Sequence, residues 1–231
     1  MKSVVGRMFD GIAPTYTLLN HILSFGLDFS WRRKLADRLE KGRPIEVLDL
    51  ATGTGDLLIS MLRRRDNIKK AVGLDISENM LVLCRKNIER SSLSDRVTLI
   101  QGDAARTGLP DGRFDAVTMA FGIRNVPDPA QTLSEIYRLL RQGGAALILE
   151  FSLPANRIIR SLYLVYLRHV VPFMGYLISG DKAAYRYLNM TIEAFDKDRD
   201  LPGLMRKAGF SNISTKTLTL GTVSLCSACK P

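Results

Sequence analysis

A short glycine-rich segment between Asp49 and Asp56 is the first part of this sequence whose residue types could do chemistry. It reads Asp-Leu-Ala-Thr-Gly-Thr-Gly-Asp, so Gly53 and Gly55 allow tight turns and let a ligand approach the backbone closely. Thr54 adds a hydroxyl group, and the helix expected to follow begins with free N–H groups that attract an anion. The segment therefore predicts a site for the anionic part of a ligand.

Two further carboxylates follow later strands of the expected sheet. Asp75 ends the second strand, where a carboxylate can accept hydrogen bonds from both hydroxyls of a ribose. Its alternative role is the N-cap of the next helix, which Ser77 fills better. Asp103 lies in a Gly-Asp-Ala sequence after the third strand, where it is either an acceptor for an adenine amino group or a turn-forming residue. Because ligands bind outside the carboxyl ends of strands in open parallel sheets, the three elements together predict a nucleoside-containing cofactor.

Two classes of cofactor share these features. The dinucleotide fingerprint G-x-G-x-x-G needs a third glycine, but Leu58 stands at that position. The methionine carboxylate of S-adenosylmethionine instead suits the helix N-terminus behind the loop. We therefore expect S-adenosylmethionine, bound by Gly53, Thr54, Gly55, Asp75 and Asp103.

Strands and helices alternate through the middle of the chain and must position these residues. Such alternation is typical of βαβ units and predicts an α/β fold with a mostly parallel sheet. Strands are expected at 46–50, 71–75, 97–101, 114–119 and 145–151, and helices from residue 57, at 78–90 and at 129–140, with Gly143-Gly144 as the last helix stop.

The alternation gives way at both ends of the chain. Helical periodicity predicts an N-terminal cap over residues 1–42, including a helix at 30–40. A helical insertion at 155–198 is expected to cover the substrate. The length of 231 residues fits one domain, which we expect to span the whole chain. The rest is predicted as a helix at 200–208 and an antiparallel hairpin of strands 213–218 and 222–226 around Gly221.

Composition narrows the class of protein. A hydrophobic fraction of 46% and a charged fraction of 24% exclude wholesale disorder. The formal charge of +10 indicates either an anionic partner or simple solubility. Three cysteines argue against a disulfide framework and fit a reducing compartment. Because His21 and His169 are the only histidines available to complement Cys226 and Cys229, we expect no metal site.

The most apolar stretch covers residues 158–178. Arg160, Arg168 and His169 interrupt it, whereas a membrane-spanning helix needs about 20 residues with few charges. It is either an amphipathic helix at an anionic lipid surface or a buried lid helix. We expect a cytoplasmic protein that touches the inner face of the membrane at most peripherally.

Several segments together give the chain a family resemblance. The sequence resembles the class I methyltransferases and, more closely, the UbiE/MenG quinone-biosynthesis C-methyltransferases, over nearly its whole length. Phe121-Gly122-Ile123-Arg124-Asn125-Val126 is the most family-specific piece. The others are 8–13, 18–20, 49–56, 73–81, 148–152 and 185–188.

The resemblance implies a Rossmann-like, seven-stranded sheet with an antiparallel last strand. It also implies S-adenosylmethionine-dependent C-methylation of a polyprenylated quinol, giving menaquinol or a ubiquinol precursor. Thr54, Asp75, Asp103 and Ala104 match the family's cofactor residues. The sequence departs from the family pattern at Thr17, Ala120 and Cys226.

Methyl transfer to a ring carbon needs that carbon to be nucleophilic. A phenol-like hydroxyl has a pKa near 10, so a base or a nearby cation would help. The catalytic candidates are Arg124, Asn125 and Tyr185, each with a packing role as the alternative. Glu150, His169, Asp181, Arg186 and Tyr187 are further candidates.

Two rival functions remain open at this point. The positive charge favours a nucleic-acid methyltransferase, but a Pro-Pro-Tyr-like amino-methylation motif is missing after the fourth strand. We therefore expect no nucleic-acid partner. A cofactor-binding scaffold without turnover is the second rival, and it would explain the departures at Thr17 and Cys226.

Overall fold

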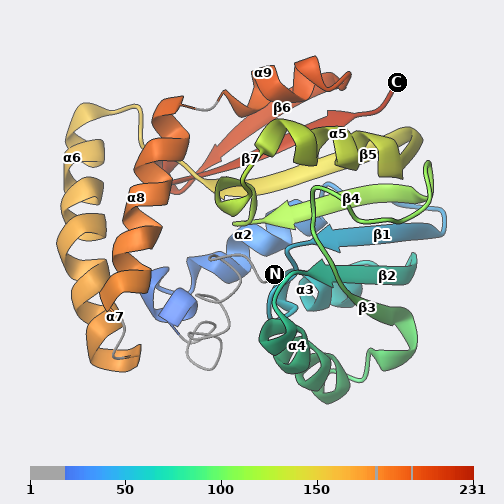
Figure 1. Cartoon of the computed structure of the whole chain (residues 1–231), viewed down its shortest axis with the longest axis horizontal. Helices are drawn as coiled ribbons and strands as arrows, with labels where there is room; N and C mark the ends of the chain where they lie inside the picture. The colour runs from blue at the N-terminus through green and yellow to red at the C-terminus, as the bar shows by residue number, and fades with distance from the viewer. Residues whose placement is uncertain (1–18, 180–181, 199) are drawn as a thin grey trace.

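The computed structural model describes residues 19–179, 182–198 and 200–231. Seven strands form one sheet in the order β3-β2-β1-β4-β5-β7-β6 (Figure 1). β1 to β5 pair in parallel, whereas β7 runs antiparallel to both of its neighbours, as predicted. The strands are β1 (Ile45–Leu50), β2 (Ile68–Asp75), β3 (Val97–Gln101), β4 (Phe114–Ala120), β5 (Leu140–Phe151), β6 (Ser211–Leu218) and β7 (Val223–Cys229).

Helices cover both faces of the sheet. β1 shows how one strand serves both, since Val47 joins the core with Leu58 and Leu48 joins the core with Leu133. A strand buried on both faces reads as a nearly continuous apolar run, as here. The first core lies beneath α2 (Leu27–Ala36), α3 (Asp56–Arg64) and α4 (Glu78–Arg90), and the second beneath α5 (Pro129–Leu139) and α9 (Leu201–Lys207).

Three helices form a separate layer beyond the carboxyl ends of the parallel strands, where the strand arrows point in Figure 1. They are α6 (Arg157–Val165), α7 (Val171–Ser179) and α8 (Lys182–Asp198), with a π-helical turn at Tyr166–Val170 between the first two. Leu167, Val171 and Ile192 pack there against Leu19. Among the described residues, no helix combines the length and apolarity needed to cross a bilayer.

Several boundaries differ from the sequence prediction, and α2 and β5 show two of these differences. The helix expected at 30–40 begins at Leu27 and ends at Ala36. It begins earlier than predicted because Gly26, with a positive φ of 72°, is its N-cap. The strand expected from residue 145 begins at Leu140, so Gly143-Gly144 does not end a helix. Gly143 instead has a φ of 73° within the part of β5 where its pairing with β4 shifts register. The N-terminal periodicity before residue 19, with Thr17, lies outside the described residues.

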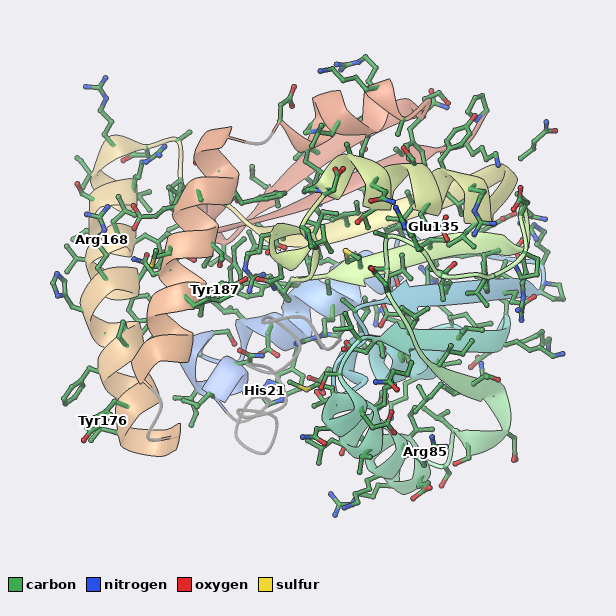
Figure 2. The ribbon with its side chains drawn as sticks, viewed as in Figure 1. His21, Arg85, Glu135, Arg168, Tyr176 and Tyr187 are labelled. Carbon is green, nitrogen blue, oxygen red and sulfur yellow. The ribbon has the colours of Figure 1, made fainter. Side chains whose placement is uncertain are left out.

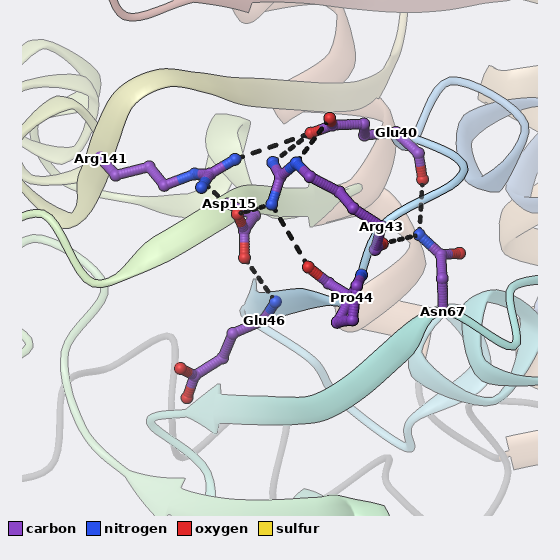
Figure 3. Close-up of polar contacts among 7 residues, drawn as sticks. All are labelled: Glu40, Arg43, Pro44, Glu46, Asn67, Asp115 and Arg141. Carbon is purple, nitrogen blue, oxygen red and sulfur yellow. Dashed lines mark hydrogen bonds and ion pairs between the residues drawn. The ribbon is translucent and has the colours of Figure 1, made fainter.

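The amino ends of β1 and β4 are tied together by charged side chains (Figure 3). Asp115 accepts a hydrogen bond from the Glu46 amide at 2.6 Å and from Arg43 Nη1 at 2.8 Å. Arg141 Nε forms an ion pair with Asp115 at 2.6 Å, and Glu40 pairs with Arg43. This edge of the sheet is therefore closed by direct carboxylate–guanidinium contacts.

Candidate functional site

The loop after β1 turns sharply where the glycines stand. Gly53 has a φ of 56° and Gly55 a φ of 85°, and Gly55 is the N-cap of α3. A Cβ atom on Gly55 would lie 2.6 Å from Cys84 Sγ, so packing against α4 also requires glycine here. The loop therefore presents backbone amides at the start of α3, as an anionic ligand group requires.

Asp75 closes this loop from the end of β2. Its Oδ2 accepts a hydrogen bond from Gly53 N at 2.8 Å, and its Oδ1 accepts one from Ser77 N at 2.9 Å. Ser77 is the N-cap of α4 and accepts a hydrogen bond from Met80 N. Asp75 is therefore not the helix cap, and its carboxylate is held between the two loops.

A cavity of about 170 Å³, which we call the cofactor cavity, lies beside these loops at the carboxyl ends of the strands. It brings together Gly53, Asp75, Asp103 and Ala104 from the ends of three strands. Thr54 and Gly55 do not line it; the Thr54 hydroxyl donates to Asp56 at 3.2 Å. The end of β4 and the segment after it also line the cavity, with Ala120, Phe121, Gly122 and Asn125.

Asp49 is a buried acid beneath this cofactor cavity that the sequence analysis did not single out. Thr118 Oγ1 donates to its Oδ1 at 2.6 Å, and Thr52 Oγ1 donates to its Oδ2 at 2.7 Å. Burial raises the pKa of the Asp49 carboxyl to about 7, and the nearby Asp75 adds to the rise. Asp49, the first residue of the glycine-rich segment, thus holds the loop through its hydrogen bond from Thr52.

A second, larger cavity of about 300 Å³ lies between α2, the segment after β4 and the layer of α6 to α8. We call it the acceptor cavity. Phe121 and Asn125 line both cavities, so the two meet there. Three aromatic rings line it together: Phe121 lies 4.5 Å from Phe151 and 6.0 Å from Trp31 between ring centroids. Its lining is mainly apolar, as expected for an aromatic ligand.

Arg124 and Glu150 form a buried ion pair beside the acceptor cavity. Arg124 Nη1 lies 2.6 Å from Glu150 Oε1, and the two side chains are 4% and 1% exposed. The same nitrogen also donates to Phe121 O at 2.6 Å. Arg124 Nε and Asn125 Oδ1 are buried without a hydrogen-bond partner among the described residues. Both candidates therefore offer unused hydrogen-bonding capacity next to the acceptor cavity.

The other catalytic candidates differ in whether they line the acceptor cavity. The side chain of Tyr185 belongs to α8 but lies outside the described residues, as do those of Asp181 and Arg186. Tyr187 lines the acceptor cavity, whereas His169 does not. Arg160 and Arg168 point to acidic residues of α8: Arg160 Nη2 lies 3.6 Å from Asp196, and Arg168 Nη2 lies 2.6 Å from Glu193 (Arg168 is labelled in Figure 2).

A cluster on α2 escaped the sequence analysis. Asp28 and Arg32 are buried, line the acceptor cavity and pair with each other, and His21 Nδ1 lies 2.7 Å from Asp28 Oδ2. The available signal was helical spacing, since Asp28, Trp31 and Arg32 fall at i, i+3 and i+4 on one face.

Solved structures of similar shape are distant in sequence. A possible histamine N-methyltransferase from Thermotoga maritima aligns with a TM-score of 0.66 at 19% identity, covering 98% of this chain and 100% of that one. The [4+2]-cyclase SpnF aligns with a TM-score of 0.68 at 17% identity, covering 98% and 96%. Since these two proteins carry different activities, the likeness shows the fold alone.

Sequence relatives are much closer. A demethylmenaquinone methyltransferase of Thermus thermophilus is 44% identical over 218 residues, which are 94% of this chain and 97% of that protein. One from Bacteroides fragilis is 40% identical over 226 residues, or 98% and 92%. The ubiquinone/menaquinone biosynthesis C-methyltransferase UbiE of Geobacter sulfurreducens is 39% identical over 218 residues, or 94% and 85%. The model of the ubiE/COQ5 methyltransferase family matches residues 1–230, so the chain belongs to that family of S-adenosylmethionine-dependent enzymes.

Proposed function

We propose that the protein transfers a methyl group from S-adenosylmethionine to a ring carbon of a polyprenylated quinol, forming menaquinol or a ubiquinol precursor. The observation that carries this proposal is the aromatic acceptor cavity, which meets the cofactor cavity at Phe121 and Asn125. Such a lining suits a quinol ring and the first part of an isoprenoid tail. The names of the relatives support the same class of acceptor.

The cofactor cavity fits the nucleoside and the methionine part of S-adenosylmethionine, which supplies a methyl group on a sulfonium. Asp75 lines this cavity and is held there by hydrogen bonds from Gly53 N and Ser77 N, and we assign its carboxylate to the ribose hydroxyls. We assign Asp103 and Ala104 to the adenine, and the loop of Gly53, Thr54 and Gly55 to the methionine part.

Arg124 and Asn125 are proposed to hold one oxygen of the quinol ring. An N–H of Arg124 donates, and the amide oxygen of Asn125 accepts, so one hydroxyl can satisfy both unpartnered atoms. A guanidinium at this place fixes the ring in position by a charge-assisted hydrogen bond to this oxygen. Tyr185 stays a candidate from the sequence alone.

The exposed side of α6 and α7 is the proposed peripheral contact with a bilayer that holds the insoluble tail. Residues 157–179 include no acidic residue. Because Arg160 and Arg168 pair with α8, apolar burial rather than these two charges would carry the contact. The apolar side chains exposed there are Ile158, Leu162, Val165, Phe173, Tyr176 and Leu177.

Vesicle flotation tests this contact. The double variant Leu162→Asn and Phe173→Asn should bind phosphatidylcholine vesicles containing phosphatidylglycerol at least tenfold more weakly than the unchanged chain, with little dependence on salt. Val82→Asn, which alters an exposed apolar residue on α4, is the matched control. Equal binding by all three proteins would contradict this contact.

The reaction itself is tested with labelled S-adenosylmethionine and a reduced demethylmenaquinone analogue. We expect label in the extracted quinone and no transfer to the oxidised form, whose ring carbon is not nucleophilic. Arg124→Gln should lower kcat by roughly 10²-fold, as for a reacting ring that is held about 1 Å out of place. Cofactor binding without transfer to any prenylated quinol would contradict the proposed function.

A further inference from the structure

The acceptor cavity has a polar group at each end of an aromatic pair. Arg32 lies over the ring of Phe121 at 5.9 Å, the rings of Phe121 and Phe151 lie 4.5 Å apart, and Arg124 lies over Phe151 at 5.1 Å. The two guanidinium groups thus bracket the pair. Asp28 is the ion-pair partner of Arg32, the guanidinium that lies over Phe121, whereas Arg124 lies over Phe151.

The Asp28 carboxylate is buried but not saturated. It is 2% exposed, and its Oδ1 accepts a hydrogen bond from Ser24 Oγ at 2.8 Å. Its Oδ2 is shared by His21 Nδ1 at 2.7 Å and by Arg32 Nη1 (His21 is labelled in Figure 2). A carboxylate offers about four lone-pair sites, so these described donors leave Oδ1 with capacity for one more donor.

Other side chains of the cavity are poor proton acceptors. Burial raises the pKa values of Tyr163, Tyr166 and Tyr187, so these phenols keep their protons at neutral pH. Guanidinium groups do not lose theirs. Asp28 is the one carboxylate among the described residues that line the acceptor cavity. The Arg32 charge and the Ser24 and His21 contacts outweigh burial and lower its pKa, so Asp28 is ionised at neutral pH.

We propose that Asp28 accepts the proton of the quinol hydroxyl that lies opposite the one held by Arg124 and Asn125. This inference rests on the proposed function. A para-quinol carries its two oxygens on opposite sides of the ring, which matches polar groups at both ends of the aromatic pair. Asp28 is then a catalytic residue, whereas His21 and Arg32 are positioning residues that fix its carboxylate and keep it charged.

The proton transfer balances with the methyl transfer. The quinol O–H breaks and its proton goes to Asp28 Oδ1, so the oxygen electron pair enters the ring. The ring carbon forms its bond to the methyl group as the S–CH3 bond breaks, and that electron pair stays on sulfur. The carbon then loses its hydrogen as a proton to water, and Asp28 returns its proton to the ring oxygen. One proton is released in total.

Asp28→Asn tests the assignment under anaerobic conditions. We expect kcat at pH 7 to fall by about 10²- to 10⁴-fold, the usual contribution of a general base. The deficit should shrink about tenfold for each pH unit toward the quinol pKa near 10, since the quinol then ionises unaided. A purely structural role for Asp28 would give no such recovery. Asp37→Asn, an exposed carboxylate at the end of the same helix, is the matched control and should keep the original rate.

Trp31 supplies a readout other than activity. It is the only tryptophan of the chain and lines the acceptor cavity, so its fluorescence reports a bound quinone analogue directly. The dissociation constant should change less than threefold in Asp28→Asn, because the change affects proton transfer rather than ring contact. A loss of analogue binding that accounts for the whole fall in rate would overturn the proposal.

The unchanged enzyme and a second variant keep the test decisive if Asp28→Asn does not fold. The kcat of the unchanged enzyme should stay level from pH 6 to pH 9, and Asp28→Glu should lower it at least tenfold while keeping it level. A wild-type rate that rises tenfold per pH unit, or full activity in Asp28→Asn at pH 7, would overturn the proton acceptor alone. A wild-type enzyme without transfer to any quinol would instead contradict the proposed function.

Discussion

At the amino ends of β1 and β4, carboxylates meet guanidinium groups directly, whereas at the carboxyl end of β1 a carboxylate meets hydroxyl groups. Asp115 contacts Arg43, Arg141 and the Glu46 amide. Asp49, at the other end of β1, accepts only from Thr52 and Thr118 among the described side chains. The amino ends of the strands, which we call the closed edge, are therefore held together by charge pairing. The carboxyl ends, which we call the open edge, keep polar groups available for ligands.

The pKa values of two acids show the same contrast between guanidinium and hydroxyl partners. Glu135, a partly buried residue of α5, accepts hydrogen bonds from Arg138 and from Thr107, and these contacts lower its pKa to about 2 (Glu135 is labelled in Figure 2). Asp49, beneath the cofactor cavity, has its pKa raised to about 7 by burial. Ionised Asp49 therefore costs stability, whereas ionised Glu135 adds stability.

Asp75→Ala should have the largest effect, because it changes the carboxyl ends of the strands, where the ligands are expected to bind. Asp75→Ala removes the carboxylate that accepts from Gly53 and Ser77 and that we assign to the ribose hydroxyls. We expect the dissociation constant for S-adenosylmethionine to rise at least a hundredfold, which is the loss of about 3 kcal/mol from two charge-assisted hydrogen bonds. Calorimetric titration measures it, with Asp115→Asn as the control. An unchanged constant would show that the ribose assignment is wrong.

Asp49→Asn should change the pH dependence of stability. Since the folded pKa of about 7 exceeds the unfolded value near 3.9, folded protein binds the proton more tightly, and wild-type stability falls as pH rises from 4 to 7. The variant cannot ionise there, so relative to wild type it should gain on the order of 2–4 kcal/mol across this range. Urea unfolding at pH 4 and pH 8 measures the difference, and a constant offset would contradict the raised pKa.

Asp115→Asn weakens the closed edge. It removes the charge that Arg43 and Arg141 share, and we expect the free energy of unfolding to fall by about 1–3 kcal/mol at pH 7. Because these contacts lie at the far end of the strands, kcat and cofactor affinity should stay within twofold of wild type. A large loss of affinity in a stable variant would mean that the two edges are coupled.

Glu135→Gln gives the smallest effect, with a sign opposite to that of Asp49→Asn. The folded pKa of about 2 lies below the unfolded value, so ionised Glu135 stabilises the fold above pH 4.5, and that contribution is lost as pH falls toward 2. Discounted for solvent screening, the variant should lose about 1 kcal/mol at pH 7 and nothing near pH 2. A loss that persists in acid would indicate altered packing rather than charge.

The sequence predicted what local signals determine. Helix α4 begins and ends at the predicted residues, because Ser77 caps it and the apolar pattern is regular. Gly53, Asp75, Asp103 and Ala104 meet because successive parallel strands end at one edge of a sheet.

The sequence did not predict features that depend on contacts between residues far apart in the chain. The start of β5 depends on a register shift against β4, which a Gly-Gly pair does not reveal. The Asp28 cluster lines a cavity only because α2 packs near Phe121, which follows β4, and Tyr166, in the turn after α6. Asp49 owes its raised pKa to burial by the whole sheet. None of these follows from spacing along the chain.

The position of Phe121 between the two cavities affects the order of events in turnover. Its backbone φ of 57° is unusual for a bulky residue and costs on the order of 1–3 kcal/mol, and its side chain lines both cavities. A wall shared by two ligands makes their affinities reciprocal: any factor by which the cofactor tightens quinol binding is the factor by which the quinol tightens cofactor binding. Demethylated cofactor left behind after transfer would act through the same wall, so product release and substrate entry are thermodynamically linked through the wall that Phe121 forms with Asn125.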